Sequence, residues 1–302
     1  MRPRVALFGH GEMGRRHATA LEGYADLVIV DPVAGVSSLR VTVDAAILAV
    51  PAELHARVAL PLLRAGVPCL VEKPLATTLD DADDLASFPR AWVGHVERFN
   101  PAFLALREAA RTCDWRHADF VREGPRPERV VDLDAALDLL VHDLDLLAEL
   151  APGDPVVALD ARAHPAAGVA CHEGITTMVT LASGRTASFQ TARGLPVRRR
   201  RVALSDIGPG PRVLGEGAPE FSRTESPGVG PLADLLAQRA WWGPLALEVR
   251  DHDALRAQDL AFLALARGES VDGPSPATAA EGRDAVALAL RAMHLRDRAA
   301  KP

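Results

Sequence analysis

The chain has 302 residues, of which 48% are hydrophobic, 25% are charged and only 4% are aromatic, and its formal net charge is −6. This length favours two domains, and the composition is typical of a globular protein rather than of a disordered or fibrous one. The acidic balance and the small number of aromatic rings argue against a nucleic-acid partner.

The sequence predicts neither a signal peptide nor a membrane span. The first apolar stretch, Val5 to Phe8, ends at once in a glycine turn, and no segment reaches the ~18 to 20 unbroken apolar residues that a span requires. Cys69, Cys113 and Cys171 are odd in number and lack Cys-x-x-Cys spacing, which indicates neither a disulfide framework nor a zinc site. We therefore expect a cytoplasmic protein with no membrane partner and no bound metal.

The chain opens with a short apolar strand followed by a Gly-x-Gly-x-x-Gly motif. Gly9 is expected to make the tight turn, Gly11 to let the backbone approach a pyrophosphate, and Gly14 to let the following helix pack closely on the sheet. The phosphates would lie at the N-terminus of this helix, where unpaired N–H groups and the dipole favour negative charge. The candidate cofactor-binding residues of this turn are Gly9, Gly11, Glu12, Met13 and Gly14.

An acidic residue follows the next expected strand. Residues 25–30 are typical of a second strand, and Asp31 comes 22 positions after Gly9, close to the ~20-residue spacing of an acid that binds the adenosine ribose. Its carboxylate would repel a 2′-phosphate. The sequence therefore favours NAD over NADP as the cofactor.

Strand and helix signals alternate up to about residue 112, which is typical of a parallel sheet with crossover helices. The link from Asp31 to Asp44 is short, so we expect one crossover helix to be trimmed to a turn. The expected strands are 44–50, 68–71 and 91–96, and the expected helices are 52–65 and 101–111. The first domain is predicted to span residues 1–114 and the second residues 115–302.

The second half has a different pattern, with a strand at 115–122, a helix at 134–150 and a hairpin of strands 176–181 and 186–192, before helices at 253–267 and 277–298. Residues 206–231 are rich in Gly and Pro and predict a long loop, either a lid or a tether. Four arginines, 198–201, fall in an expected strand, so at most two could meet one ligand. A solvated edge or a subunit contact is the alternative.

Lys73 follows directly on a buried strand, within Glu72-Lys73-Pro74. Doubly wound sheets present ligands at the carboxyl ends of their strands. There an ammonium group could donate a hydrogen bond to a substrate oxygen and stabilise developing negative charge. The alternative is a surface lysine in a turn fixed by Pro74.

Asp138 and His142 lie four residues apart on the expected helix 134–150, so they share one face. The carboxylate could orient the imidazole, whose reference pKa of ~6.5 suits proton removal from an alcohol. The alternative is a solvated pair, but the leucine-rich surroundings predict that His142 is at least half buried. His142, Asp143 and Asp145 do not predict a metal site, because adjacent helical side chains point apart.

The order of these motifs resembles the family of glucose-fructose oxidoreductase, inositol dehydrogenase and MocA. The resemblance covers nearly the whole chain and implies an α/β fold, with an N-terminal Rossmann dinucleotide-binding domain and a C-terminal α/β domain that has a large, mostly antiparallel open sheet. It also implies an NAD(P)-dependent dehydrogenase acting on CH–OH groups of sugars or cyclitols, assembled as a homodimer or homotetramer. The motifs that carry it are Gly9-x-Gly11-x-x-Gly14, Asp31, Glu72-Lys73-Pro74 and Asp138-x-x-x-His142-Asp143-x-Asp145.

The resemblance also implies roles for single residues. Lys73, Asp138 and His142 would form the catalytic group, Glu72 and Pro74 would shape the loop, and Pro51, His55, Glu72 and Lys73 would border the cofactor. Residues 93–101 and 140–146 are similar to the branch of UDP-N-acetylglucosamine 3-dehydrogenases. On that interpretation Arg98 and Asn100, with His142, contact the substrate. The alternative is a surface ion pair for Arg98 and a cap on the helix from Pro101 for Asn100.

Three functions stay open at this point. The leading hypothesis is hydride transfer between NAD and a secondary alcohol carbon of a sugar, nucleotide sugar or cyclitol. The second is an NAD-dependent glycosidase that acts by transient oxidation at C3, which would release an aglycone without net NADH. The third is an NAD(H)-binding sensor without turnover, which the joint presence of Lys73, Asp138 and His142 disfavours.

Overall fold

The computed structural model describes residues 2–30, 42–126, 133–164, 171–205, 230–242, 245–250 and 252–300. The chain forms two compact units, each made of two segments. Unit 1 comprises Met1–Phe99 and His252–Ala287, and unit 2 comprises Asn100–Asp251 and Leu288–Pro302. This differs from the two uninterrupted domains, 1–114 and 115–302, that the sequence predicts. Asp31 and the expected loop as far as residue 229 lie outside the described residues.

Unit 1 is built on a six-stranded sheet in the order β14-β5-β4-β3-β1-β2. Strands β1 to β5 pair in parallel, and β14 pairs antiparallel with β5 at one edge of the sheet. The strand order reverses between β1 and β3, the point at which doubly wound sheets bind ligands. The strands are β1 (Arg4–Phe8), β2 (Asp26–Val30), β3 (Ala45–Leu48), β4 (Cys69–Glu72), β5 (Ala91–Gly94) and β14 (Ala277–Thr278).

Strands β3, β4 and β5 are buried at every residue, as continuous apolar runs predict for the interior of a parallel sheet. The α-helices of unit 1 are α1 (Glu12–Ala20), α2 (His55–Arg64), α3 (Leu79–Ala86), α6 (Ala254–Ala266) and the first part of α7 (Ala279–Ala299), and the short 3₁₀ helices are η2 (Ala52–Leu54) and η3 (Val96–Phe99).

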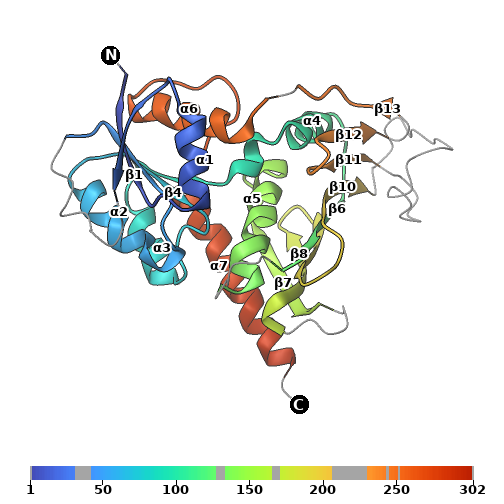
Figure 1. The fold of residues 1–302 in the computed structure, drawn as a ribbon. Helices are drawn as coiled ribbons and strands as arrows, with labels where there is room; N and C mark the ends of the chain where they lie inside the picture. The colour runs from blue at the N-terminus through green and yellow to red at the C-terminus, as the bar shows by residue number, and fades with distance from the viewer. Residues whose placement is uncertain are drawn as a thin grey trace. The chain divides into compact units, whose positions relative to one another are not determined.

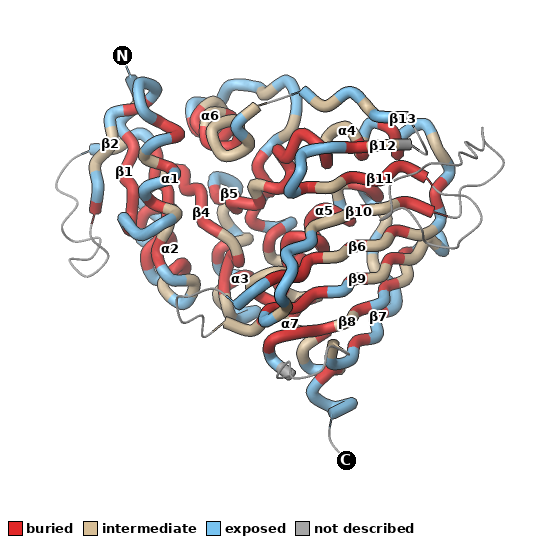
Figure 2. The backbone as a smooth tube through the Cα atoms, turned by 45° about the vertical axis from the view of Figure 1, so that its right-hand side comes forward, coloured by how far each residue is buried: buried red, intermediate tan, exposed pale blue. Residues whose placement is uncertain are grey.

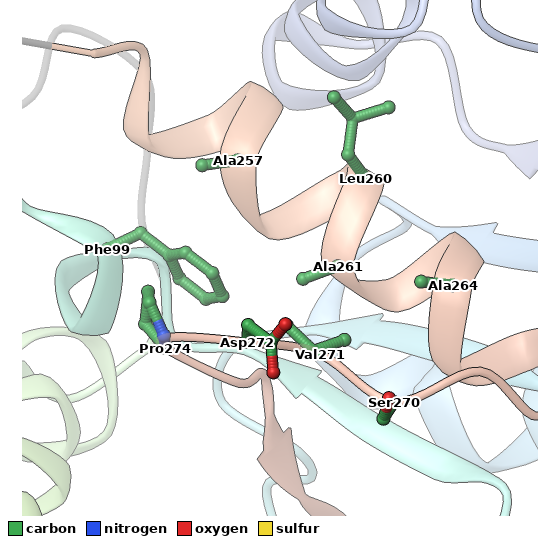
Figure 3. A pocket seen from close by; sticks show the side chains of 9 residues that line it. All are labelled: Phe99, Ala257, Leu260, Ala261, Ala264, Ser270, Val271, Asp272 and Pro274. Atoms are coloured by element: carbon green, nitrogen blue, oxygen red, sulfur yellow. The ribbon is translucent and has the colours of Figure 1, made fainter.

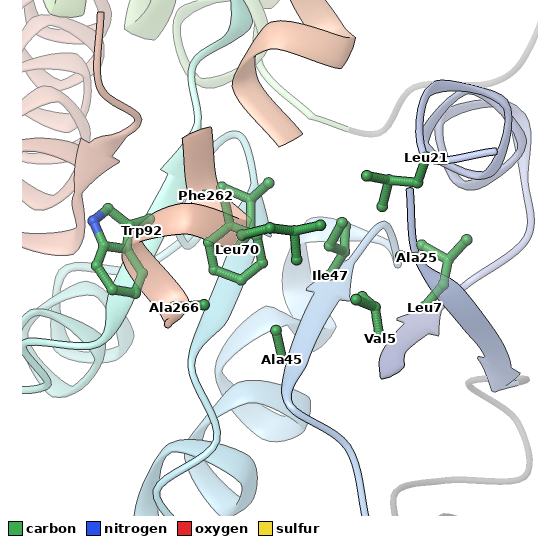
Figure 4. Packing of buried hydrophobic residues seen from close by; sticks show 11 residues of the cluster. Val5, Leu7, Leu21, Ala25, Ala45, Ile47, Leu70, Trp92, Phe262 and Ala266 are labelled. Carbon is green, nitrogen blue, oxygen red and sulfur yellow. The ribbon is translucent and has the colours of Figure 1, made fainter. Parts of the chain in front are cut away.

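Helix α6 belongs to unit 1 although it comes late in the chain, and it lies beside α1 (Figure 1). Phe262 of α6 packs edge-on against Trp92 of β5, with ring centroids 5.8 Å apart. Both rings belong to the apolar cluster drawn in Figure 4, which also contains residues of β1, β3 and β4. The expected assignment of residues 253–267 to the second domain therefore differs from the structure, because α6 completes the core of the parallel sheet.

The turn after β1 requires glycine at two positions. Gly9 has a φ of +88°, and a Cβ there would lie 2.5 Å from the carbonyl oxygen of Ala49. A Cβ on Gly14 would lie 2.0 Å from the carbonyl oxygen of Gly9, so a side chain would push α1 away from the turn. A Cβ on Gly11 would meet no atom of the described residues within 4 Å. The geometry thus agrees with the tight turn and close packing expected from the motif.

Unit 2 is built on an eight-stranded sheet in the order β13-β12-β11-β10-β6-β9-β8-β7. Among the described strands only β6 and β9 pair in parallel, which confirms a mostly antiparallel sheet. The strands are β6 (His117–Gly124), β7 (Val156–Ala163), β8 (Gly174–Leu181), β9 (Thr186–Arg193), β10 (Arg199–Ser205), β11 (Pro231–Asp234), β12 (Arg239–Trp242) and β13 (Leu245–Ala246).

Buried and less buried residues alternate along β6 and β9 (Figure 2), as expected where one face of a sheet packs against a core. Phe120 and Phe189 stack on the buried face with ring centroids 4.8 Å apart. The hairpin predicted around Ser183-Gly184 is confirmed by the pairing of β8 with β9.

Helix α4 (Pro101–Ala110) packs against β11 and β12, so it belongs to unit 2 rather than to the N-terminal domain as expected. The helix predicted over 134–150 has two parts, a π-helical turn η4 (Ala136–Leu140) and α5 (Val141–Leu150). A short 3₁₀ helix, η5 (Cys171–Glu173), precedes β8. None of the helices in the described residues combines the length and the apolar character that crossing a bilayer demands.

The two glycines of the turn give a matched pair of stability predictions. Gly14→Ala should lower the free energy of unfolding by roughly 1–3 kcal/mol, because the new methyl group overpacks against the Gly9 carbonyl. Gly11→Ala should change it by less than about 1 kcal/mol, since its methyl group enters open space. Urea unfolding of both variants checks this. Equal losses would contradict the close approach of α1.

Candidate functional site

The first turn of α1 offers backbone N–H groups at the carboxyl end of β1. Its N-cap is Gly11, in an extended conformation, and no side chain of the described residues caps this helix end. Unpaired N–H groups and the helix dipole together bind phosphate well. With open space over Gly11, these residues fit the pyrophosphate of a dinucleotide.

Lys73 is half-buried directly after β4, and its peptide bond to Pro74 is cis. Its backbone N–H donates a hydrogen bond to Oε2 of Glu72 at 3.2 Å. The Glu72 side chain is itself buried and lies against Gly94 of β5, where a Cβ would be 2.7 Å from Oε1. The carboxylate therefore occupies a space that only glycine leaves available.

His55 holds the other side of the same loop. Its Nδ1 lies 2.9 Å from the carbonyl oxygen of Pro74, and its Nε2 lies 3.1 Å from that of Val50. Burial lowers the pKa of His55 and outweighs these hydrogen bonds, which raise it. A neutral imidazole has a single N–H group, so His55 donates a hydrogen bond to only one of these two carbonyl oxygens. Contact of His55 and of the exposed Pro51 with a cofactor stays a prediction.

The imidazole of His17, on α1, is fully buried between two carboxylates. Its Nδ1 lies 2.8 Å from Oδ2 of Asp259 on α6, and its Nε2 lies 3.1 Å from Oε1 of Glu72. Burial on its own lowers the pKa of His17, but the charges of Asp259 and Glu72 and their hydrogen bonds raise that pKa to about 10. His17 is therefore an imidazolium at neutral pH, and both of its N–H groups donate.

The two carboxylates respond differently to this cation. Burial raises the pKa of Glu72, but the hydrogen bond and charge of His17, with a smaller contribution from Lys73, bring that pKa below its ordinary value. Burial raises the pKa of Asp259 and outweighs the opposing effect of His17. Glu72 is thus the firmly ionised partner of the imidazolium.

Sequence reasoning missed His17 and Asp259. A signal for His17 was present, because it follows Gly14 by three residues and so lies on the face of α1 that packs against the sheet. Asp259 is an acidic residue among the buried apolar residues of α6. A charged residue on a buried helical face requires a partner, but helical periodicity does not identify which one.

Asp138 and His142 lie in unit 2, on η4 and in the first turn of α5, and His142 is buried as predicted. Oδ2 of Asp138 accepts a hydrogen bond from Nη1 of Arg193 on β9 at 3.3 Å. The buried Arg193 also donates to the carbonyl oxygen of Leu133 at 2.7 Å and pairs with Glu173 at 3.2 Å. Arg193 therefore fixes the Asp138 carboxylate, a role that sequence reasoning missed. Orientation of His142 by Asp138 stays a prediction.

Asp143 forms a buried ion pair with Arg122 of β6, with Nη2 and Oδ1 2.7 Å apart. The carboxylate of Asp143, a residue of the Asp138-to-Asp145 motif, is therefore held by a guanidinium group. Within the ranges that the structure describes, no group of three or more His, Cys, Asp or Glu residues is arranged to hold a metal ion.

Asn100 caps α4, as the structural alternative predicted. Its Oδ1 accepts a hydrogen bond from the backbone N–H of Ala102, and its Nδ2 donates to the carbonyl oxygen of Leu235, both at 3.0 Å. Arg98 lies 3.5 Å from Glu281 in an ion pair, but its side chain is buried rather than at the surface. Substrate contacts of Arg98 and Asn100 stay predictions.

A pocket of about 360 Å³ lies between α6 and residues 270–274 (Figure 3). Its lining is mostly apolar, from Phe99 and from Ala257, Leu260, Ala261 and Ala264 of α6. Apart from Asp272 it has no charged lining residue among those described, and it contains none of the predicted site residues. The carboxyl ends of β1 and β4, with the glycine turn and Lys73, therefore remain the candidate site of unit 1.

The charge on His17 predicts a dependence of stability on pH. The folded protein keeps this proton up to about pH 10, whereas the unfolded chain releases it near 6.5. The contribution of His17 to the free energy of unfolding is therefore complete below pH 6.5 and is lost as the pH rises towards 10. In this window the free energy of unfolding should fall by about 1 kcal/mol per pH unit.

Urea unfolding of the wild type and of His17→Gln across this window checks the prediction. The variant should lack this part of the slope, while the effect of the buried Cys69 thiol, whose pKa burial raises, is common to both proteins. Parallel slopes would show that His17 is neutral in the folded protein.

Residues 24–90 match the GFO_IDH_MocA pattern of an oxidoreductase family with an NAD-binding Rossmann fold. The chain is 31% identical over 228 residues to a UDP-N-acetylglucosamine 3-dehydrogenase of Acidithiobacillus ferrooxidans, covering 67% of this chain and 72% of that protein. It is 30% identical over 270 residues to a myo-inositol dehydrogenase of Streptomyces leeuwenhoekii, covering 82% of this chain and 77% of that protein.

Solved structures show the same fold. The UDP-N-acetylglucosamine 3-dehydrogenase from Acidithiobacillus ferrooxidans matches with a TM-score of 0.76 and 25% identity over 99% of both chains. A scyllo-inositol dehydrogenase from Lactobacillus casei, solved with NAD(H) and scyllo-inositol, matches with a TM-score of 0.70 and 14% identity over 99% of this chain and 98% of that one, which supports the fold alone. By sequence identity and coverage, the chain belongs to the Gfo/Idh/MocA oxidoreductase family with an NAD-binding Rossmann fold.

Proposed function

We propose that the chain is an NAD-dependent dehydrogenase acting on a secondary alcohol carbon of a sugar, nucleotide sugar or cyclitol. The observation that carries the proposal is its similarity to two dehydrogenases, one named for UDP-N-acetylglucosamine and one for myo-inositol. Both named compounds contain a six-membered ring that carries secondary hydroxyl groups. This shared chemistry defines the substrate class that we propose.

In this proposal the cofactor is held by residues of the N-terminal turn. The uncapped N-terminus of α1 receives the pyrophosphate, which the open space over Gly11 admits. Asp31 binds the ribose hydroxyls and excludes a 2′-phosphate, which favours NAD. When bound, the nicotinamide supplies the hydride acceptor for the oxidation.

Lys73 binds the reacting oxygen of the substrate. Only two of the 34 basic residues in the chain are lysines, Lys73 and Lys301. Arginine stays protonated in proteins and presents a planar fork of donors, whereas lysine offers a compact ammonium group that can release a proton. A lysine at the end of β4, in a chain whose other basic residues are arginines except for Lys301, supports a chemical role for this side chain.

His142 accepts the hydroxyl proton of the alcohol, and Asp138 stabilises the imidazolium that forms. Arg193 holds Asp138 in turn, through its hydrogen bond from β9. Lys73 would hold the substrate oxygen as the alcohol is oxidised to a carbonyl. In the reverse direction His142 returns the proton.

We also propose that the protein is a cytoplasmic homodimer or homotetramer. The resemblance to the family supports assembly through the sheet of unit 2, whose strand β8 exposes Met178 by 46%. Light scattering during size-exclusion chromatography measures the number of subunits directly.

Substitution of Lys73 or of His142 tests the proposed catalytic roles of these two residues. Lys73→Arg and His142→Asn should each lower kcat by roughly 10²–10⁴-fold, because each removes a proton-transfer or oxygen-binding group from the transition state. Lys301→Arg is the matched control and should leave kcat unchanged. NADH formation with UDP-N-acetylglucosamine or myo-inositol measures turnover, and calorimetry should show unchanged NAD affinity. An equal loss of turnover and NAD affinity would contradict these roles.

Asp31 provides a separate test of cofactor choice. Asp31→Ser should raise the ratio of NADP to NAD affinity by at least about tenfold, because juxtaposed like charges cost several kcal/mol. Calorimetric titration with both dinucleotides measures the ratio. An unchanged ratio would mean that another group selects the cofactor.

A further inference from the structure

Three ionisable side chains form a continuous buried chain through unit 1. Asp259 of α6, His17 of α1 and Glu72 of β4 are linked by contacts of 2.8 Å and 3.1 Å. His17 and Asp259 are fully buried, and Glu72 is 7% exposed. These residues come from elements far apart in sequence. The chain thus joins the helix that begins at the glycine turn to the strand that ends at Lys73.

The last contact of this chain reaches Lys73 itself. Oε1 of Glu72 accepts from His17, and Oε2 accepts the backbone N–H of Lys73 at 3.2 Å. Gly94 makes room for the carboxylate, since a Cβ there would lie 2.7 Å from Oε1 and 3.1 Å from Cδ. Both oxygens of the Glu72 carboxylate therefore accept a hydrogen bond. His17, the backbone of Lys73 and Gly94 confine the side chain.

Stability alone is a poor explanation for this arrangement. Removing charged groups from water costs several kcal/mol for each ion, and apolar residues of similar volume often replace a buried ion pair without loss of stability. Here two acidic groups surround one imidazole, so the cluster has more acidic than basic groups. The ammonium group of Lys73 is close enough to affect Glu72 electrostatically. A rigid acidic group beside a loop lysine is useful where that lysine must keep a fixed position.

We propose that His17 and Asp259 are positioning residues for Lys73, which act by holding the Glu72 carboxylate against the backbone N–H of Lys73. This inference rests on the proposed role of Lys73 in binding the substrate oxygen. The imidazolium fixes the Glu72 rotamer, and Asp259 fixes the ring of His17 by accepting its second N–H. The same imidazolium ties the loop of Lys73 to α1, the helix that follows the dinucleotide turn.

The two lysines of the chain allow a direct readout without substrate or cofactor. Reductive methylation with isotope-labelled formaldehyde gives each lysine one methyl resonance, and Lys301→Arg leaves Lys73 as the one labelled lysine. In this background Glu72→Gln, His17→Gln and Asp259→Asn should each shift the Lys73 resonance. Asp83→Asn is the matched control, because Asp83 pairs with Arg283 at 2.7 Å on the surface of the same unit, and it should leave the resonance in place.

Turnover gives the second readout, with NAD and UDP-N-acetylglucosamine or myo-inositol. His17→Gln and Asp259→Asn should lower kcat by up to about 100-fold, since a small displacement of a catalytic group has effects of this size. The KM for NAD should stay within about twofold of the wild-type value. The lost interactions position the group that binds the reacting oxygen and do not contribute to cofactor binding.

A steric variant tests the same contact without changing any charge. Gly94→Ala should displace the Glu72 carboxylate, shift the Lys73 resonance and lower kcat. In a Glu72→Ala background the added methyl group meets no carboxylate, so Gly94→Ala should then have little further effect on either readout. This non-additivity is expected only if Gly94 acts through Glu72.

The outcomes separate this inference from the proposed function. If Lys73→Arg keeps full turnover, the proposed role of Lys73 fails, whereas the methyl resonance still reports whether the buried chain positions this residue. If Lys73→Arg abolishes turnover but His17→Gln, Asp259→Asn and Gly94→Ala leave the resonance and kcat unchanged, the positioning role is overturned. Urea unfolding of each variant identifies any that fail to fold, and Gly94→Ala then decides the question without removing a charge.

Discussion

The burial of one positive charge is the constraint on which unit 1 depends. The His17 imidazolium has no access to solvent, so its charge is tolerated only because two carboxylates accept its N–H groups. Glu72 comes from the strand that ends at Lys73, but the second partner, Asp259, is supplied by a helix that follows the whole of unit 2. The stability of the N-terminal segment of unit 1 therefore depends on α6, which follows unit 2 in the sequence and supplies Asp259.

Helix α6 meets this condition and an apolar one together. Three residues after Asp259, Phe262 enters the core and packs against Trp92 of β5. Residues at this spacing lie close together on a helix, so the counter-charge and the apolar anchor are fixed by the same docking. A shift of α6 along its axis would break both contacts. Unit 1 is thus built from two segments of the chain because α6 supplies both a counter-charge for His17 and an apolar side chain for the core.

Much of the fold could be predicted from the sequence because its signals are local. Continuous apolar runs gave the parallel strands β3 to β5, and an alternating pattern with a Ser-Gly turn gave the hairpin of β8 and β9. The placement of α4 and α6 could not be predicted. An apolar helical face shows that a helix is buried but not against which sheet, and both helices have partners distant in sequence.

The π-helical turn at Ala136–Leu140 shows the same limit on a smaller scale. Residues 134–150 carry a regular helical pattern, which predicts one uninterrupted helix, yet η4 has a wider turn. Asp138 lies inside this turn, and its carboxylate meets Arg193 of β9. Spacing along the chain therefore identified the candidate acid and base, whereas the arginine that holds the acid depends on the pairing of strands.

Different cations compensate the buried carboxylates Glu72 and Asp259 of unit 1 and Asp143 and Glu173 of unit 2. Unit 2 compensates buried acids with arginine, in Arg122 with Asp143 and in Arg193 with Glu173. A guanidinium group keeps its charge and presents several donors in a fixed plane, which suits a permanent structural contact. In unit 1 the cation between the two buried carboxylates Glu72 and Asp259 is the imidazolium of His17, while the buried Arg98 pairs with the more exposed Glu281. The charge of an imidazolium depends on a proton, so the compensation of buried carboxylates in unit 1 depends on pH, unlike in these two arginine pairs of unit 2.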